Sequence, residues 1–280
     1  EFPESYINYY QYAKKESDSA INGQGFKLSD NLEEWLTIFD ANNGNNSEMI
    51  FDVQGSSLSG QGTAISNIFT PRNAGLSGVG FGGTNKLKGK FINNRINKSD
   101  NRFQRSIVTQ YETSTRIFNI NPGMIAYIPT IKETGIKGNT LWLVWTAKYI
   151  DKEATTEYTS RQNWHIIRLA DVYLMRAEAK AEILSDPSAA NNDINILRNR
   201  VEMSNINYSS LTMNSFRKEL LKERAVELYM EGHRFFDLKR FGVYDEYCRL
   251  IYGGTDGARQ PEDYLWPIPI SEVSTNSKIN

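Results

Sequence analysis

The stretch KERAVELYMEGHRFFDLKRFG, Lys222 to Gly242, places nine formal charges among large apolar side chains in twenty-one residues. If Leu221, the residue before the stretch, is included, apolar or small residues follow one another at intervals of four, three and four positions. This is the spacing of one helix face. This face consists of Leu221, Ala225, Leu228 and Gly232. We therefore predict a helix through the stretch, with glycine allowing a neighbouring backbone to approach.

A second, acidic face runs along the same predicted helix, since Glu223, Glu227 and Glu231 follow at intervals of four residues. Carboxylates on successive turns repel one another by a few tenths of a kcal/mol per pair. Arginine relieves such repulsion well, because its planar guanidinium pairs with carboxylates in a bidentate way. We predict a structural charge network of Arg168, Glu223, Arg224, Glu227, Glu231, Arg234 and Asp237, with Arg176, Arg198 and Arg200 as further possible partners.

The alternative for these glutamates is acid–base catalysis. Glycosidases need two carboxyl groups that face each other across a cleft, about 5 to 10 Å apart, whereas glutamates on successive turns point the same way. A di-iron site would need a Glu-x-x-His step, but Glu231 precedes His233 by two residues. The chain also lacks a Gly-x-Ser-x-Gly elbow, a phosphate-binding loop and a His-Glu-x-x-His motif. We predict a scaffold, not an enzyme, with no catalytic residue.

Composition excludes several partner classes. The chain has 280 residues and a formal net charge of −1, so it has no global electrostatic reason to bind nucleic acid. Its one cysteine and two histidines make a metal site improbable, and no cofactor motif is present. No apolar run approaches the about 18 residues of a membrane span. The basic stretch from Lys86 to Arg105 is interpreted as a solvated face.

Periodicity predicts a mainly α-helical fold of tetratricopeptide-like helical hairpins, with long loops and a few short β-strands. The predicted helices are 5–21, 31–39 with Asp30 as the N-cap, 84–97, 164–184, a helix from Pro187 to about Met203, and a last helix from Thr212 through the opening stretch. The predicted strands are 48–53, 104–111, 124–128 and 141–149, and the segment 264–270 is predicted to be extended. Residues 55–83 hold eight of the twenty glycines and one charge, Arg72, which predicts a long loop of functional type.

Five segments resemble the SusD/RagB family. They are NWHIIRLADVYLMRAEAKAE (163–182), INILRNRVEM (194–203), the opening stretch, LWPIPISEV (265–273) and YYQYAKKESDSAING (9–23). SDNRF (99–103) is similar to the family's Asp-Pro-Arg turn, with Asn101 where proline is usual. The resemblance covers nearly the whole chain and is weakest over 55–83 and 112–139.

This resemblance implies a SusD-like α/α architecture and a surface-exposed lipoprotein of the Gram-negative outer membrane. Family members bind glycans without cleaving them and work with a SusC-like TonB-dependent transporter. They are about twice as long as this chain, so we expect a C-terminal half whose lipid anchor, the sole membrane attachment, lies on the missing N-terminal part. We treat 1–280 as one domain, with a helical and strand entry (1–54), a loop-rich insertion (55–160) and a helical scaffold with an extended tail (161–280).

The insertion is the expected ligand surface, because loops on a rigid scaffold often carry function. Glycans are recognised by aromatic rings that stack on sugar faces and by amide and guanidinium groups that bond hydroxyls. The candidate glycan-binding residues are Phe69, Arg72, Asn73, Phe81, Tyr111, Trp142 and Trp145. Core packing is the alternative role for each aromatic residue. The predicted function is capture of an oligosaccharide or polysaccharide for a transporter. The alternatives are an adaptor that binds a protein or peptide and, less favoured, a glycoside hydrolase.

Overall fold

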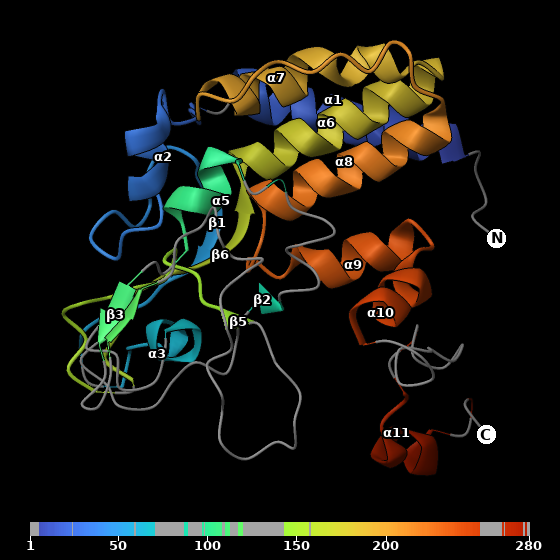
Figure 1. Cartoon of the computed structure of the whole chain (residues 1–280). Helices are drawn as coiled ribbons and strands as arrows, with labels where there is room; N and C mark the ends of the chain where they lie inside the picture. Colours follow the sequence, from blue (N-terminus) through green and yellow to red (C-terminus); the bar gives the residue numbers. More distant parts are fainter. Residues whose placement is uncertain are drawn as a thin grey trace. The chain divides into compact units, whose positions relative to one another are not determined.

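The computed structural model describes residues 6–23, 25–58, 60–70, 87–88, 97, 99–107, 110–112, 117–119, 143–156, 158–252, 265, 267–276 and 278. The chain divides into two compact units, Glu1–Arg234 and Phe235–Asn280. Each unit is described by itself. The described part is mainly helical, with strands only in short pairs, which confirms the predicted fold class (Figure 1).

The first unit is built around α6 (Leu169–Leu184), which contacts α1 (Tyr6–Gly23), α7 (Asn191–Asn199) and α8 (Met213–Glu227), as Figure 1 shows. Small side chains allow this close packing: Ala170, Ala177, Ala179 and Ala181 are fully buried on α6. Ala-rich faces let helix backbones approach, and the neighbouring leucines and isoleucines fill the remaining space. The result is the stack of helical hairpins that the sequence predicts.

Side chains begin these helices where the sequence predicts. Asp186 accepts a hydrogen bond from the backbone N–H of Ser188 and opens the 3₁₀ turn η2 (Pro187–Ala190) that leads into α7. Thr212 accepts from the N–H of Ser215 and caps α8. At the end of α6, Ser185 takes a left-handed conformation with φ of 51° and stops the helix.

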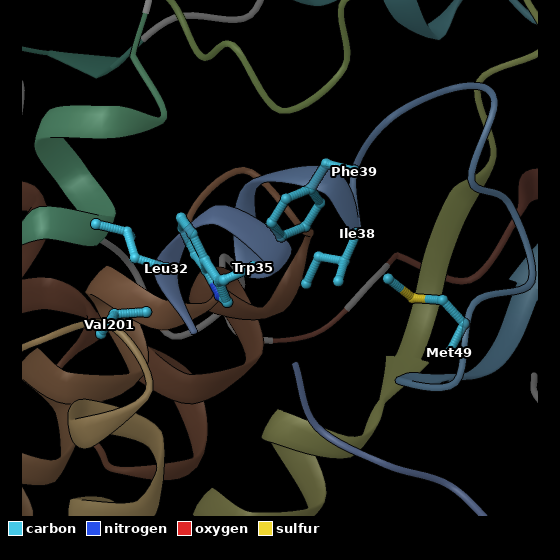
Figure 2. Close-up of a cluster of buried hydrophobic side chains, with 6 residues drawn as sticks. All are labelled: Leu32, Trp35, Ile38, Phe39, Met49 and Val201. Atoms are coloured by element: carbon cyan, nitrogen blue, oxygen red, sulfur yellow. The ribbon is translucent and has the colours of Figure 1, made fainter. Parts of the chain in front are cut away.

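The short helix α2 (Leu32–Thr37) anchors an apolar cluster, which we define as Leu32, Trp35, Ile38, Phe39, Met49 and Val201 (Figure 2). Trp35 is fully buried in it, as predicted. The N-cap differs from the prediction: the side chain of Asn31, not Asp30, accepts from the N–H of Glu34 at 2.9 Å. Asn and Asp are about equally good caps, so the pattern Asp-Asn leaves the register open by one residue.

One antiparallel strand pair joins distant parts of the first unit. In it β1 (Met49–Val53) pairs with β6 (Trp164–Arg168), and Phe51 lies opposite Ile167. The prediction of a helix from Trp164 is wrong for its first five residues, because α6 begins at Leu169. The run Trp-His-Ile-Ile is aromatic and β-branched, which suits a strand, and the cross-strand partner was not visible in the local pattern.

Shorter elements lie inside the segment 55–160. They are α3 (Ile65–Phe69), α5 (Asn101–Arg105), and the strand pairs β2 (Leu87–Lys88) with β5 (Leu143–Val144) and β3 (Gln110–Glu112) with β4 (Ile117–Asn119). The predicted strand 104–111 is wrong at its start, which belongs to α5, because Asp100 caps that helix. The predicted helix 84–97 is wrong at 87–88, which form a strand. The predicted strand 124–128 lies outside the described residues.

The predicted helix through 212–242 is interrupted. The helix α8 ends at Glu227 and α9 (His233–Arg240) follows after a turn in which Met230 and Gly232 have φ of 60° and 88°. Two left-handed residues cannot lie within a helix, and glycine adopts this region without strain. A Cβ on Gly232 would meet only the Trp164 ring, at an ordinary contact distance of 3.5 Å, so glycine is needed here for its backbone conformation and the expected approach of a neighbouring backbone is not found.

The second unit holds α10 (Tyr244–Tyr252) and α11 (Ile270–Thr275), together with most of α9. An aromatic contact between Phe235 and Tyr244, with ring centroids 5.3 Å apart, joins α9 to α10. Residues 267–269 are not helical, as the prolines predict, but Ile270 already belongs to α11. Residues 264 and 266 of the predicted extended segment lie outside the described residues.

Candidate functional site

A buried ion cluster lies where α5, α8, β6 and the end of α7 meet in the first unit. We define it as Glu48, Arg102, Lys148, Arg168, Arg200, Glu223, Glu227 and Glu231. Glu227 is its centre. Its carboxylate accepts from Arg168 at 2.8 Å, Arg200 at 2.6 Å and Arg102 at 3.0 Å. Three guanidinium groups on one carboxylate satisfy the pairing that a buried charge needs.

Glu231 forms the second centre of the ion cluster, in the turn after α8. It binds Arg168 Nε at 2.6 Å and Lys148 Nζ at 2.7 Å. Lys148 also donates to the carbonyl oxygens of Glu227 at 3.1 Å and Tyr229 at 3.3 Å. Its ammonium lies 4.6 Å from the ring centroid of Phe39. The last part of segment 55–160 is thereby fixed to the helical scaffold.

Arg102 fixes an earlier part of the same segment. Its guanidinium binds Asp100 at 2.7 Å and Glu223 at 2.7 Å, in addition to Glu227. Glu223 binds Arg198 at 2.9 Å on its other side. Since Arg102 is completely buried, the turn from Ser99 to Phe103 acts as a rigid connection between the insertion and α8.

The electrostatics of the ion cluster keep its two central carboxyl groups, Glu227 and Glu231, charged. Burial alone would raise the pKa of Glu227, but Arg200, Arg168 and Arg102 outweigh it and hold that pKa well below its ordinary value. Burial likewise opposes ionisation of Glu231, yet Arg168 and Lys148 lower its pKa to about 2. Neither carboxyl group can therefore hold a proton at neutral pH and donate it as a general acid.

The same geometry removes the catalytic alternative for these glutamates. Glu227 is fully buried and Glu231 is 3% exposed, so neither faces a cleft that a sugar chain could enter. Both carboxylates are occupied by arginine or lysine. Among the residues that the structure describes, no group of three or more His, Cys, Asp or Glu could hold a metal ion.

The described part of the insertion borders a surface groove of about 380 Å³ in the first unit. Its apolar floor includes Leu36, Phe39 and Ile150, and its polar walls include Asp40, Asn42, Asp151, Lys152, Glu153 and Arg161. Arg161 binds Asp151 at 3.3 Å and Glu153 at 3.0 Å. Carboxylate, amide and guanidinium groups around an apolar floor are suited to hydroxyl-rich ligands.

One anchor of this groove is Asp151, which is 2% exposed. Burial would raise its pKa, but hydrogen bonds from the backbone N–H groups of Arg161 and Glu153 and from the Arg161 side chain lower it below 3.8. Ser160 donates to the same carboxylate at 3.2 Å. The loop 151–161 is therefore closed on itself around one charged side chain.

Two of the predicted glycan-binding residues are buried. Phe69 is 5% exposed, and its ring stacks on Trp164 at 5.9 Å and lies 4.8 Å from the Tyr149 ring. Trp145 is 7% exposed. Both positions favour packing roles for these rings, and a part in glycan binding stays a prediction.

The other predicted glycan-binding residues cannot be placed in this way. Arg72, Asn73, Phe81 and Trp142 lie outside the described residues, and Tyr111 belongs to β3, with no side chain described.

The predicted charge network divides into several places. Arg168, Glu223, Glu227 and Glu231 belong to the ion cluster, whereas Arg224 pairs with Asp171 at 2.8 Å. Arg234 donates to the carbonyl oxygen of Leu221 at 2.9 Å, and Asp237 pairs with Arg240 at 3.0 Å.

Sequence reasoning missed Glu48, Arg102 and Lys148 as members of the ion cluster. The signal for Arg102 was the turn 99–103, which was noticed only for its family resemblance. The signal for Lys148 was a lone cation within an aromatic run, Trp145 to Tyr149. His165 forms a separate pair with Asp52 at 3.0 Å.

Comparison with known proteins identifies the family to which this chain belongs. The model of the SusD family matches residues 4–280. The chain belongs to the SusD family. This confirms the resemblance drawn from the sequence, and it is consistent with the prediction of a binding protein instead of an enzyme. None of the described helices is long and apolar enough to cross a membrane.

Among curated relatives, the starch-binding protein SusD of Bacteroides thetaiotaomicron is 34% identical over 119 residues, which are 41% of this chain and 20% of that protein. SusD-like protein P2 of Formosa agariphila is 32% identical over 131 residues, which are 43% of this chain and 25% of that protein. The matched part of the chain thus spans a quarter or less of the length of these relatives.

Solved structures of SusD-like proteins share the fold over nearly the whole chain. A SusD homologue from Bacteroides thetaiotaomicron has a TM-score of 0.73 at 22% identity, covering 98% of this chain and 58% of that one. Surface glycan-binding protein A from the same species, in complex with laminarihexaose, has a TM-score of 0.70 at 16% identity, covering 98% and 59%. A laminarin-binding SusD-like protein has a TM-score of 0.63 at 25% identity, covering 96% and 57%.

Proposed function

We propose that the chain is part of a non-catalytic, cell-surface glycan-binding protein that captures oligosaccharides or polysaccharides. The observation that carries this proposal is the SusD family match over residues 4–280. Two structurally similar proteins support the ligand class, since one is described in complex with laminarihexaose and one as laminarin-binding.

The proposed ligand surface is the insertion 55–160, which the ion cluster attaches to the helical scaffold. Arg102 and Lys148 fix two points of this segment to α8 and its following turn, so the loops between these points start from a rigid base. Arg72, Asn73, Phe81, Tyr111 and Trp142 are the proposed sugar contacts. The groove beside Asp151 would add hydroxyl-binding groups at the edge of that surface.

We further propose that the whole protein passes its ligand to a SusC-like TonB-dependent transporter and is held on the outer membrane by a lipid anchor. Family membership supports both points. The test is co-purification of a transporter barrel with the full-length protein from solubilised outer membranes. Recovery of the protein without a barrel, under conditions in which it still binds glycan, would contradict the transporter proposal.

Affinity electrophoresis of the chain in gels containing laminarin or starch tests glycan binding directly. We expect retarded migration in at least one polysaccharide and no release of reducing sugar. Phe81→Ala and Trp142→Ala should each restore mobility, because each removes a proposed stacking surface. Tyr12→Ala is the matched control, since Tyr12 is 58% exposed on α1, outside the insertion.

Three results would contradict the proposed function. Release of reducing sugar would make the protein an enzyme. Unchanged mobility in every polysaccharide, with binding of a helical peptide instead, would favour the adaptor alternative. Binding that persists at full strength in both insertion variants would contradict the insertion as the main ligand surface.

A further inference from the structure

A second pocket lies on the helical side of the first unit, where α1 ends against α6 and α7. We call it the α1–α7 pocket. It has a volume of about 500 Å³ and is lined by residues from the loop 26–30 as well as from the three helices. Ligand pockets for small molecules begin at about 300 Å³, so one or two sugar rings fit. The residues used in the argument are Ile21, Phe26, Tyr173, Ile196, Asn199 and Arg200.

The aromatic wall of the pocket is held in place. Phe26 and Tyr173 are both half-buried. The Arg176 guanidinium lies over the Tyr173 ring, with 5.1 Å between Cζ and the ring centroid. Arg176 is itself tied to Asp193 on α7 at 2.8 Å and to Asp18 on α1 at 3.0 Å. One ring of the pocket is therefore braced by a residue that connects all three helices, which is the preorganisation that weak ligands need.

The polar groups of the pocket carry little net charge. Arg200 donates to Glu48 at 2.6 Å and to Glu227 at 2.6 Å, so the ion cluster neutralises its charge. At the exposed rim, Lys27 and Asp30 pair at 2.6 Å. Asn199 and Arg200 also line the pocket, and the Asn199 side chain is exposed.

These features favour a neutral ligand with apolar faces and many hydroxyl groups. An acidic ligand would need a cation that is not already paired, because a carboxylate buried without a partner is strongly disfavoured. A purely apolar ligand could not hydrogen-bond the Asn199 amide, which would lose contact with water as the ligand covers it. A pyranose ring offers C–H faces to Phe26 and Tyr173 and hydroxyls to Asn199, so it meets both requirements.

We propose that the α1–α7 pocket binds sugar units of a neutral oligosaccharide, as a second contact point separate from the insertion 55–160. The ligand class rests in part on the proposed function, whereas the place of the pocket does not. A long glycan held at two points gains affinity through the effective concentration of its second segment.

Methyl NMR of the isoleucine-labelled chain tests both sites in one sample. Ile21 and Ile196 line the α1–α7 pocket, and Ile150 lines the groove beside the insertion. The probes are laminarihexaose and maltohexaose, with hexagalacturonate as an acidic comparison. We expect concentration-dependent shifts of the Ile21 and Ile196 methyl signals with at least one neutral probe and none with the acidic one.

Variants then assign the shifts to the pocket. Tyr173→Ala and Phe26→Ala should each weaken the binding seen at Ile21 and Ile196 by at least tenfold, while Tyr12→Ala on the exposed side of α1 leaves it unchanged. Using two variants guards against a folding defect in either one, and the dispersion of the remaining methyl signals reports folding.

The outcomes separate this inference from the proposed function. Shifts at Ile150 or retardation in the gels, without shifts at Ile21 and Ile196, would overturn the second site and leave the proposed function standing. Shifts at Ile21 and Ile196 that survive both pocket variants would also overturn it, as would equal shifts with hexagalacturonate. Shifts confined to the pocket and removed by its variants would support it, even where the insertion binds nothing.

Discussion

The ion cluster around Glu227 and the apolar cluster around Trp35 touch, because Trp35 Nε1 donates to Glu227 Oε1 at 3.3 Å, yet different forces hold them. The apolar cluster gains free energy from surface removed from water, and side chains of similar size can replace one another there at modest cost. The ion cluster gains little net free energy from burial of its charges, but every missing partner leaves a charge unpaired.

This difference indicates which of the two clusters fixes the relative positions of the elements around it. An apolar side chain tolerates small shifts of its neighbours, whereas a guanidinium that binds two or three carboxylates holds each one at a set distance and angle. Residues from α5, β6 and α8, the residues just before β1 and just after α7, and the segment after β5 therefore take fixed positions around Glu227. Predictions that remove one member of each cluster test this comparison.

The largest effect is expected from Glu227→Gln. The substitution keeps the shape of the side chain but leaves Arg102, Arg168 and Arg200 buried with one carboxylate fewer. The free energy of unfolding should fall by about 3 to 5 kcal/mol, measured by urea denaturation. A loss below about 1 kcal/mol would mean that the arginines find other partners and that Glu227 is not the centre of the cluster.

Acid should act on the same cluster. The pKa of Glu231 is about 2 in the folded chain, below its ordinary value of 4.5, so its contribution to stability is complete above about pH 4.5. That contribution, about 3 kcal/mol for a shift of this size, should disappear as the pH falls from about 4.5 to 2. Plots of the free energy of unfolding against pH for the parent chain and for Glu231→Gln should converge over this window. Plots that stay parallel would contradict the role assigned to Glu231.

A smaller effect is expected in the apolar cluster. Ile38 is 4% exposed, and Ile38→Val removes one methylene group while keeping a β-branched side chain. The free energy of unfolding should fall by about 0.5 to 1.5 kcal/mol. Thermal unfolding followed by circular dichroism measures it. A loss as large as that of Glu227→Gln would show that the apolar cluster fixes geometry as strictly as the ion cluster.

The smallest effect is expected at an exposed ion pair. Arg105 binds Glu33 at 2.8 Å, with side chains 47% and 74% exposed. Glu33→Gln makes the same chemical change as Glu227→Gln but in water, so the free energy of unfolding should change by at most about 0.5 kcal/mol. The same urea titration serves as the measurement. If Glu33→Gln and Glu227→Gln lowered the free energy of unfolding equally, burial would not determine how much a carboxylate contributes to stability.

Local patterns predicted the helices of the scaffold well because their signals lie within a few residues. Asp186 and Thr212 are side-chain caps next to the residues that they serve, and the buried alanines of α6 follow helical spacing. The strand β6 was missed because its partner β1 lies more than a hundred residues earlier in the chain. The break after Glu227 was missed because Gly232 also fits a helix face, and only the backbone angles distinguish the two roles.

The site was less predictable than the fold. The acidic row of Glu223, Glu227 and Glu231 was readily noticed. Its cationic partners Arg102 and Lys148, and Glu48, which shares Arg168 and Arg200 with Glu227, come from three distant segments, and no local spacing connects them. The aromatic residues were ambiguous for a related reason. Phe69 was selected for its place in a glycine-rich segment, whereas Trp164 and Tyr149, which enclose its ring, arrive from the other end of the insertion.

The insertion leaves and re-enters the scaffold at paired points. Ile107 forms an antiparallel bridge with Thr146, and the N–H of Ala147 donates to the Ser106 carbonyl oxygen at 2.7 Å. Thr63 likewise bridges to Ser160. Because the two ends of 108–145 meet in one place, a change in the length of this segment adds little closure entropy. The helices can therefore keep their positions while the connection between Ile107 and Thr146 varies in length.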